Sequence, residues 1–166
     1  MIAYLGLGTN IDDRDSSLVK AKKELISCDI FIINSSSIYE STPMYNENQP
    51  NFYNQVLKVD IKDNPLNLLK KIKKIEVNMG RNLFAPKNSQ RIIDIDILAI
   101  EHLEYEDAQL QIPHPLLHER RFVLEPWNEI SPNFIIPKIE LTVNTMYEKL
   151  IDTVKLKRIN EFEVVN

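Results

Sequence analysis

Two aspartates separated by one residue stand in a strongly apolar segment. In residues 92–98 (IIDIDIL), the alternation of a β-strand places Asp94 and Asp96 on one face and the neighbouring isoleucines on the other. Two carboxylates this close repel one another unless a cation lies between them. In phosphoryl-transfer sites Mg²⁺ commonly takes one or two carboxylates together with phosphates and water. The pattern predicts a metal site, and the alternative is a sheet face that is simply solvated.

Basic side chains lie on both sides of this acidic pair in the sequence. Arg81, Lys87, Arg91 and Arg120 converge on the aspartates only if a loop and a later helix fold over the strand. One guanidinium group can donate two parallel hydrogen bonds to a phosphate, and its positive charge stabilises the negative charge of a phosphoryl group during transfer. His114 stands between two prolines, which restrict its backbone. Either a phosphate-binding role or a structural role fits this histidine.

The composition excludes several classes of protein. The 166 residues carry a net charge of −4, with 43% hydrophobic and 27% charged residues, which indicates a globular domain and argues against a general nucleic-acid binder. The charge is uneven: residues 62–91 hold eight basic and two acidic residues, and residues 92–119 hold seven acidic and no basic residues. Two solvated faces, or a site for phosphates and metal ions, explain this pattern. With only three glycines, the chain lacks a Walker loop or a dinucleotide-binding turn.

The elements that carry these residues alternate between strand and helix. In chain order, the apolar periodicity predicts a strand at 3–7, a helix opening at 12–15, a second strand from the runs 30–33 and 37–39, a third strand at 52–61, a helix opening at 63–65 and a strand at 92–100. This βαββαβ order predicts an α+β, ferredoxin-like sandwich, with an antiparallel sheet covered on one side by two helices. Short helices near 117–121 and 123–130 and additional C-terminal strands are expected after it.

The domain organisation follows from the same reading. We expect one domain at residues 1–137 and an extension at 138–166 packed on it, with no second enzyme fused to it. On the helix that opens at 63–65, Glu76 falls inside the apolar face. A carboxylate there must be paired or must line a cavity, because burying it alone is costly.

Several motifs together resemble one enzyme family. Residues 91–98 (RIIDIDIL), followed by PHP at 113–115 and RFVL at 121–124, resemble the 6-hydroxymethyl-7,8-dihydropterin pyrophosphokinases of folate biosynthesis. The opening residues 3–10 (AYLGLGTN) and residues 49–54 (QPNFYN) are similar to further motifs of that family. The resemblance covers about residues 2–135 in the family's order.

The resemblance implies transfer of a diphosphate from ATP to the hydroxymethyl group of the pterin, with release of AMP. It implies that Asp94 and Asp96 hold two Mg²⁺ ions and act in catalysis with Arg81 and Arg91. Glu76 would orient an arginine. The residues implied for ATP binding are Lys87, Arg91, His114 and Arg120, and those implied for pterin binding are Thr42, Pro43, Met44, Phe52, Asn54 and Phe122. Without the resemblance, core packing explains the two phenylalanines better.

The loop before Arg91 departs from the family pattern. Ser89 and Gln90 stand where the family usually has Gly-Pro, and the loop lacks the family's further arginines and tryptophan. Lys87 remains, but a lysine offers a point charge where an arginine offers a fork. This departure puts catalytic efficiency in doubt and leaves the metal pair untouched.

Two other functions remain to be weighed. A carboxylate-metal phosphohydrolase or nucleotidyltransferase would use the same acids but would leave Phe52, Asn54 and Phe122 without a task. A ferredoxin-like RNA-binding module is disfavoured by the acidic charge and by the lack of an aromatic-rich strand. The single cysteine and the absence of a signal peptide or membrane span predict a cytoplasmic protein, and we expect a monomer that binds no nucleic acid.

Overall fold

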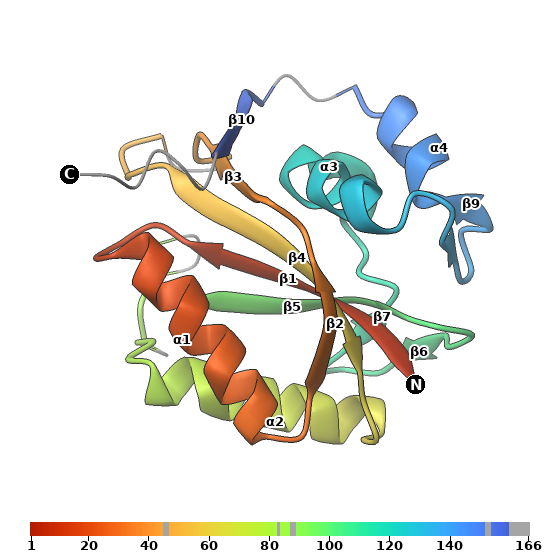
Figure 1. The fold of residues 1–166 in the computed structure, drawn as a ribbon, viewed down its shortest axis with the longest axis horizontal. Coiled ribbons are helices and arrows are strands. Elements are labelled where there is room, and N and C mark those ends of the chain that lie inside the picture. The colour runs from red at the N-terminus through yellow and green to blue at the C-terminus, as the bar shows by residue number, and fades with distance from the viewer. Residues whose placement is uncertain (45–46, 83, 87–88, 152–153, 160–166) are drawn as a thin grey trace.

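A central antiparallel sheet carries most of the candidate residues (Figure 1). The computed structural model describes residues 1–44, 47–82, 84–86, 89–151 and 154–159. The strands of the sheet are β1 (Ile2–Thr9), β2 (Phe31–Ser35), β3 (Ile38–Ser41), β4 (Phe52–Asp60), β5 (Asp94–Ile100) and β10 (Leu156–Ile159). Their order is β10-β3-β4-β1-β5, and β2 also pairs with β4.

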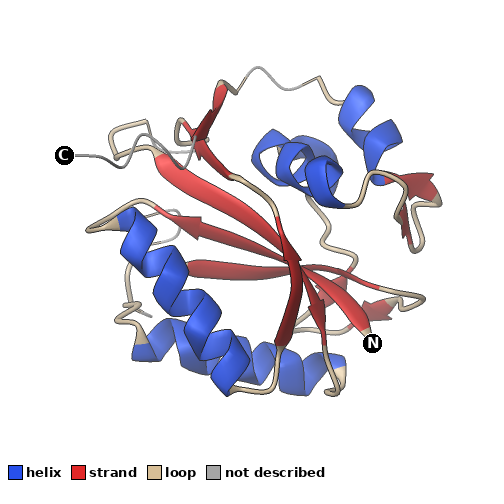
Figure 2. Cartoon of the chain, viewed as in Figure 1, coloured by secondary structure: helices blue, strands red, loops and turns tan. Residues whose placement is uncertain are grey.

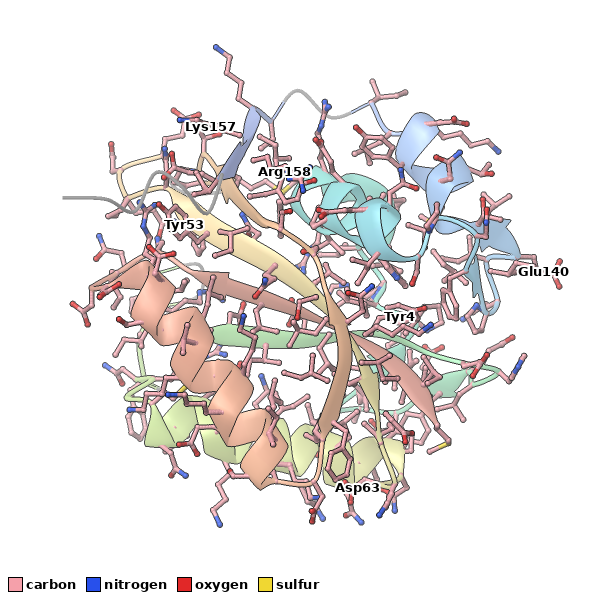
Figure 3. All side chains as sticks on the ribbon, viewed as in Figure 1. Tyr4, Tyr53, Asp63, Glu140, Lys157 and Arg158 are labelled. Carbon is pink, nitrogen blue, oxygen red and sulfur yellow. The ribbon has the colours of Figure 1, made fainter. Side chains whose placement is uncertain are left out.

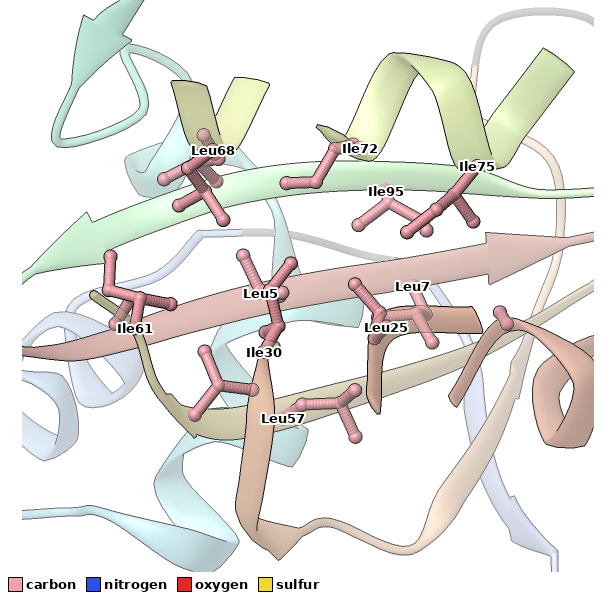
Figure 4. Close-up of a cluster of buried hydrophobic side chains, with 14 of the residues drawn as sticks. Leu5, Leu7, Leu25, Ile30, Leu57, Ile61, Leu68, Ile72, Ile75 and Ile95 are labelled. Carbon is pink, nitrogen blue, oxygen red and sulfur yellow. The ribbon is translucent and has the colours of Figure 1, made fainter. Parts of the chain in front are cut away.

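Two long helices cover one face of this sheet. The helices α1 (Arg14–Ser27) and α2 (Pro65–Asn78) begin after Asp13 and Asn64, whose side chains accept hydrogen bonds from backbone N–H groups of the first turn. The apolar stripes of both helices pack on β1, β4 and β5. Figure 4 shows the resulting core, which includes Leu5, Leu25, Leu57, Ile72 and Ile95.

Two shorter helices cover part of the opposite face. Figure 2 shows α3 (Arg121–Ile130) and α4 (Val143–Glu148) on the other side of the sheet from α1 and α2. A second apolar cluster, centred on the fully buried Trp127 with Tyr4 and Leu98, fills the space beneath them. No helix in the described part of the chain is long and apolar enough to cross a membrane.

Short elements connect these layers. They are β6 (Tyr105–Glu106) paired with β7 (Gln111–Ile112), the 3₁₀ turn η1 (Leu117–Glu119), and β8 (Ile135–Ile136) paired with β9 (Leu141–Thr142).

The predicted α+β fold with an antiparallel sheet is confirmed, and some details differ from expectation. The sheet is covered on both sides rather than on one. The two runs expected to form the second strand, 30–33 and 37–39, overlap two separate strands, β2 and β3. Between them Ser36 donates its N–H to the carbonyl oxygen of Val56, and its Oγ accepts from the Val56 N–H. β1 continues through Gly8, which was expected to end it, because Gly8 still pairs with strands on both sides.

Candidate active site

A cleft opens over β1, β4 and β5, beside the start of α3. Its lining combines glycines, aromatic rings, an amide, carboxylates and guanidinium groups, drawn from parts of the chain that are far apart in sequence. The lining residues are Gly6, Leu7, Gly8, Ser41, Thr42, Met44, Gln49, Phe52, Asn54, Gln55, Val56, Arg91, Asp94, Asp96, Arg120, Phe122 and Val123. The sheet therefore brings together both groups of residues that the sequence analysis singled out.

The floor of the cleft is formed by glycines that the sequence analysis did not place there. In the antiparallel register Gly8 lies opposite Asp94, and Gly6 lies opposite Asp96. A β-carbon on Gly8 would stand 3.8 Å from Asn54 Oδ1. A β-carbon on Gly6 would stand only 3.2 Å from Leu98 Cδ2, so Gly6 makes room for a core side chain, whereas Gly8 leaves its position free. Glycine at alternate positions of a strand allows a close approach on one face, and this spacing was the signal available in the sequence.

Each of the two aspartates is engaged by arginine. Asp94 accepts hydrogen bonds from Arg81 Nη1 at 2.7 Å and from Arg91 Nη1 at 2.6 Å. Asp96 Oδ2 accepts a hydrogen bond from Arg120 Nη1 at 2.9 Å. Burial raises the pKa of Asp94, but the charges of Arg91 and Arg81 outweigh this effect, and the pKa is lowered overall. Asp94 is therefore a carboxylate at neutral pH.

Glu76 is fully buried behind the cleft and reaches β5 from α2. Its Oε1 accepts a hydrogen bond from the backbone N–H of Ile95 at 2.8 Å and forms an ion pair with Arg81. Its Oε2 accepts a hydrogen bond from Lys73 Nζ at 2.9 Å. Burial raises the pKa of Glu76, and the nearby Lys73 and Arg81 oppose the rise. Glu76 is thus paired, as its position on the apolar face required, and it holds Arg81 beside Asp94.

His114 lies next to Asp96, just outside the lining of the cleft. Its Nδ1 accepts a hydrogen bond from the backbone N–H of Leu116 at 3.1 Å, so the ring proton of the neutral form is on Nε2. Nε2 is 3.9 Å from Asp96 Oδ2. Burial lowers the pKa of His114, and the charge of Asp96 opposes this shift.

The other end of the cleft is aromatic and amide-bearing. Phe52 of β4 and Phe122 of α3 both line it, and Asn54 lies with Phe52 beside the Gly8 floor. The amide nitrogen of Asn54 donates to the carbonyl oxygen of Tyr39 at 3.1 Å and to Ser41 Oγ at 2.8 Å. Because a backbone carbonyl can only accept, the amide orientation is determined, and Oδ1 is the atom left to accept from a ligand.

The remaining predicted residues are spread around the cleft. Thr42 and Met44 line it, whereas Pro43, between them, is not part of the lining. Lys87 lies outside the described residues.

Asn10 joins the two sides of the cleft, and it was not among the residues expected at the site. It is almost fully buried. Its backbone N–H and side-chain Oδ1 bond the backbone of Arg91 at 3.2 and 2.9 Å. Its Nδ2 donates to Gln49 Oε1 at 3.0 Å and to the carbonyl oxygen of Pro50 at 3.2 Å. Asn10 thereby links the segment before β4 to the segment before β5.

Comparison with known proteins identifies the family of the chain. The sequence model of the family described as 7,8-dihydro-6-hydroxymethylpterin-pyrophosphokinase (HPPK) matches residues 4–132. A 2-amino-4-hydroxy-6-hydroxymethyldihydropteridine pyrophosphokinase of Aquifex aeolicus is 43% identical over 134 residues, which are 81% of this chain and 82% of the relative. The folic acid synthesis protein FOL1 of Dictyostelium discoideum is 43% identical over 145 residues, which are 87% of this chain and 22% of that protein.

Some relatives are much longer than this chain. The chain spans about a fifth of FOL1 and of the folic acid synthesis proteins of Schizosaccharomyces pombe and Pneumocystis carinii. A crystal structure of Plasmodium falciparum HPPK-DHPS superimposes with a TM-score of 0.67 over 89% of this chain and 45% of that one, and at 20% identity it shows the shared fold. With the family match over most of its length, this chain belongs to the 7,8-dihydro-6-hydroxymethylpterin-pyrophosphokinase family.

Proposed function

We propose that this protein transfers a diphosphate from ATP to the hydroxymethyl group of 6-hydroxymethyl-7,8-dihydropterin and releases AMP. The observation that carries the proposal is a single cleft with two chemically different ends. The lining holds an aromatic and amide group, Phe52, Asn54 and Phe122, which we call the aromatic end, and a charged group, Asp94 and Asp96 with Arg91 and Arg120, which we call the phosphate end. The two groups adjoin, because the Arg120 guanidinium lies 5.7 Å from the centre of the Phe122 ring. A flat heterocycle fits the first end and a polyphosphate fits the second, so the two substrates would meet over the glycine floor.

The pterin would lie at the aromatic end. Phe52 and Phe122 offer ring faces for a planar bicycle, and stacking of this kind is favourable in an enclosed site. Asn54 Oδ1 would accept a hydrogen bond from an N–H group on the edge of the ring, since its amide nitrogen is already bonded to Tyr39 and Ser41. Backbone groups near Thr42, Pro43 and Met44 would complete this end.

The donor set at the other end fits Mg²⁺. Asp94 and Asp96 share one face of β5 and line the cleft, and the described residues contain no group of three or more His, Cys, Asp or Glu side chains that would make a metal site from protein alone. Mg²⁺ is characteristically bound by one or two carboxylates, with phosphates and water supplying the other positions. We propose that the two aspartates hold two Mg²⁺ ions, which would neutralise phosphate charge when bound with ATP.

The residues of the chain would act mainly by positioning and by charge. The hydroxymethyl oxygen attacks the β-phosphorus in line, the bond from that phosphorus to the α-phosphate oxygen breaks, and AMP leaves. Arg91 and Arg120 line the cleft and would bind phosphate oxygens, and Arg81 and His114, which lie beside Asp94 and Asp96, would contribute. A contribution of Lys87 to ATP binding rests on the family resemblance alone. Glu76 would keep Arg81 oriented, because the carboxylate is anchored to the Ile95 N–H.

One assay tests this function. The protein is incubated with MgATP, with and without 6-hydroxymethyl-7,8-dihydropterin, and the nucleotide products are separated. We expect AMP only when the pterin is present, and no turnover after Mg²⁺ is removed with EDTA. Formation of ADP, or hydrolysis that does not need the pterin, would instead identify a phosphohydrolase or another phosphotransferase.

We further propose that the protein acts as a monomer in a reducing compartment such as the cytoplasm. Every side chain assigned above comes from one chain, and the single cysteine, Cys28, cannot form an internal disulfide. Size-exclusion chromatography with light scattering tests the first statement, and a mass of one chain is expected.

A further inference from the structure

Glu129 of α3 collects hydrogen bonds from the sheet on the side of the molecule away from the phosphate end. Its carboxylate accepts from the backbone N–H of Ser37 at 3.1 and 3.2 Å and from Ser37 Oγ at 2.8 Å. The Tyr39 hydroxyl donates to Glu129 Oε2 at 3.0 Å. Burial, and after it Glu129, raises the pKa of Tyr39 to about 12, so the phenol keeps the proton that it donates. These bonds join α3 to β3.

Arg158 of β10 completes this cluster. Its Nε donates to Ser37 Oγ at 2.8 Å, and its Nη2 lies 3.3 Å from Glu129 Oε1. The strand register places Arg158 opposite Tyr39, and the side chain lies on the side of β10 that faces α3 (Figure 3). β10 is outside residues 4–132, the segment that the family model matches.

The cluster of Ser37, Tyr39, Glu129 and Arg158 is connected to the aromatic end of the cleft through both of its partners. In β3, the backbone carbonyl of Tyr39 accepts from the amide of Asn54, directly opposite it in the register. In α3, the helix that carries Glu129 also carries Phe122, which lines the cleft. A change in the spacing of β3 and α3 would therefore move Asn54 relative to Phe122.

We propose that Arg158 is a positioning residue for pterin recognition, acting through Glu129 and β3 to set the distance between Asn54 and Phe122. The inference rests on the proposed function, because it takes the pterin as the ligand of this end. Arg158 touches no residue that lines the phosphate end in any bond described above. Arg120 directly precedes α3 and bonds Asp96, so a shift of α3 also reaches the ATP side, and the effect should fall more on the pterin than on ATP.

The experiment compares full-length wild type with Arg158→Ala, Arg158→Lys and Glu129→Gln. Lys155→Ala is the matched control, since it removes an exposed cation just before the same strand. For each protein the KM for the pterin is measured at saturating MgATP, the KM for ATP at saturating pterin, and the midpoint of thermal unfolding. Arg158→Lys and Glu129→Gln keep the size of the side chain, so they carry the test if Arg158→Ala does not fold.

We expect Arg158→Ala to raise the pterin KM about three- to tenfold, as loss of a partly exposed charged pair allows, with the ATP KM within about twofold of wild type. Arg158→Lys should recover part of the loss and Lys155→Ala should match wild type. An unchanged pterin KM in folded variants, or an equal rise in both KM values, overturns the inference. If wild-type protein forms no AMP, the proposed function fails and this inference fails with it. If wild-type protein forms AMP but the variants show the KM values just named, only this inference fails.

Discussion

Gly8 of β1 lies directly opposite Asp94 of β5 in the sheet. On its other side the same glycine pairs with Asn54 of β4. The backbone of β1 therefore runs between the proposed metal ligand and the proposed pterin ligand with no side chain above it. This is where the two substrates would have to approach each other, so the absence of a β-carbon should matter for binding more than for folding.

Replacing Gly8 tests this idea. A β-carbon at this position would be 3.8 Å from Asn54 Oδ1 and 3.9 Å from Phe52 Cδ1, which are ordinary contacts. Gly8→Ala should fold with an unchanged or slightly raised unfolding midpoint, because alanine is favoured over glycine in a strand by roughly 0.5–1 kcal/mol. Gly8→Val should fill the cleft and raise the pterin KM by at least about tenfold. Steady-state kinetics and calorimetry on both variants check this, and equal KM values for all three proteins would show that the floor lies elsewhere.

Asn54→Asp should lose pterin binding although it keeps a side-chain acceptor. A carboxylate cannot donate to the Tyr39 carbonyl, which now accepts from the Asn54 amide at 3.1 Å, so the side chain is expected to turn away. We expect the pterin Kd, followed by ligand fluorescence, to rise by at least about tenfold. Ser41→Ala removes only the second hydrogen bond of the Asn54 amide, the one to Ser41 Oγ, and should have a smaller effect. Tight binding by Asn54→Asp would contradict the proposed role of the Asn54 amide.

Variants of the two aspartates should differ in their stability and should lose activity to a similar extent. Asp94→Asn removes the carboxylate that bonds both Arg81 and Arg91, so that Arg91 loses its countercharge and Arg81 keeps only Glu76, whereas Asp96→Asn removes the carboxylate partner of Arg120. We expect Asp94→Asn to lower the free energy of unfolding by about 1–3 kcal/mol, and Asp96→Asn by less. Each should reduce kcat by at least about 100-fold, since even the mutation of residues that only hydrogen-bond to metal ligands typically lowers metal affinity or activity by about 10- to 100-fold. Urea unfolding and turnover at pH 7 test both, and a fully active Asp96→Asn enzyme would rule out the metal assignment.

The start of α1 should make stability depend on acidic pH. The hydroxyl and backbone N–H of Ser16 lower the pKa of Asp13, so its contribution to stability is present above the unfolded pKa and is lost as the pH falls through the folded pKa. Asp13→Ala should therefore lower the unfolding midpoint at pH 7, and the loss should shrink as the pH falls below the usual Asp pKa of about 3.9. Asn64→Ala removes the cap of α2, which does not titrate, and should cost about 1 kcal/mol throughout this pH range. A loss from Asp13→Ala that stays constant with pH would exclude charge as its cause.

Local patterns were enough to predict several parts of the site. The placement of Asp94 and Asp96 on one face follows from strand alternation, and the need of Glu76 for a partner follows from helical periodicity. The partners themselves were not predictable in this way. Arg120 meets Asp96 and Arg81 meets Asp94 only because α3 and the end of α2 pack beside β5.

The hydrogen bonding of Asn54 shows the same limit. Its amide was expected to both donate to and accept from the pterin, and the structure leaves only Oδ1 for a ligand. The difference arises from the pairing of β3 with β4, a contact that depends on sheet register. Additional C-terminal strands were expected, but their pairing was not predictable, because the place of β10 at the sheet edge beside β3 depends on a contact between distant segments.

The separation of two apolar layers by the sheet has a consequence for engineering and for evolutionary change. The layer under α1 and α2 contains none of the proposed site side chains except the anchoring Glu76, whereas the layer under α3 continues into the wall of the cleft. Libraries of variants that are made to increase stability can therefore be confined to the layer under α1 and α2. Substitutions that accumulate there during evolution should have little effect on ligand preference. Libraries of variants that are made to bind a new heterocycle should target the layer under α3, where each substitution will alter both the stability of the protein and its ligand preference.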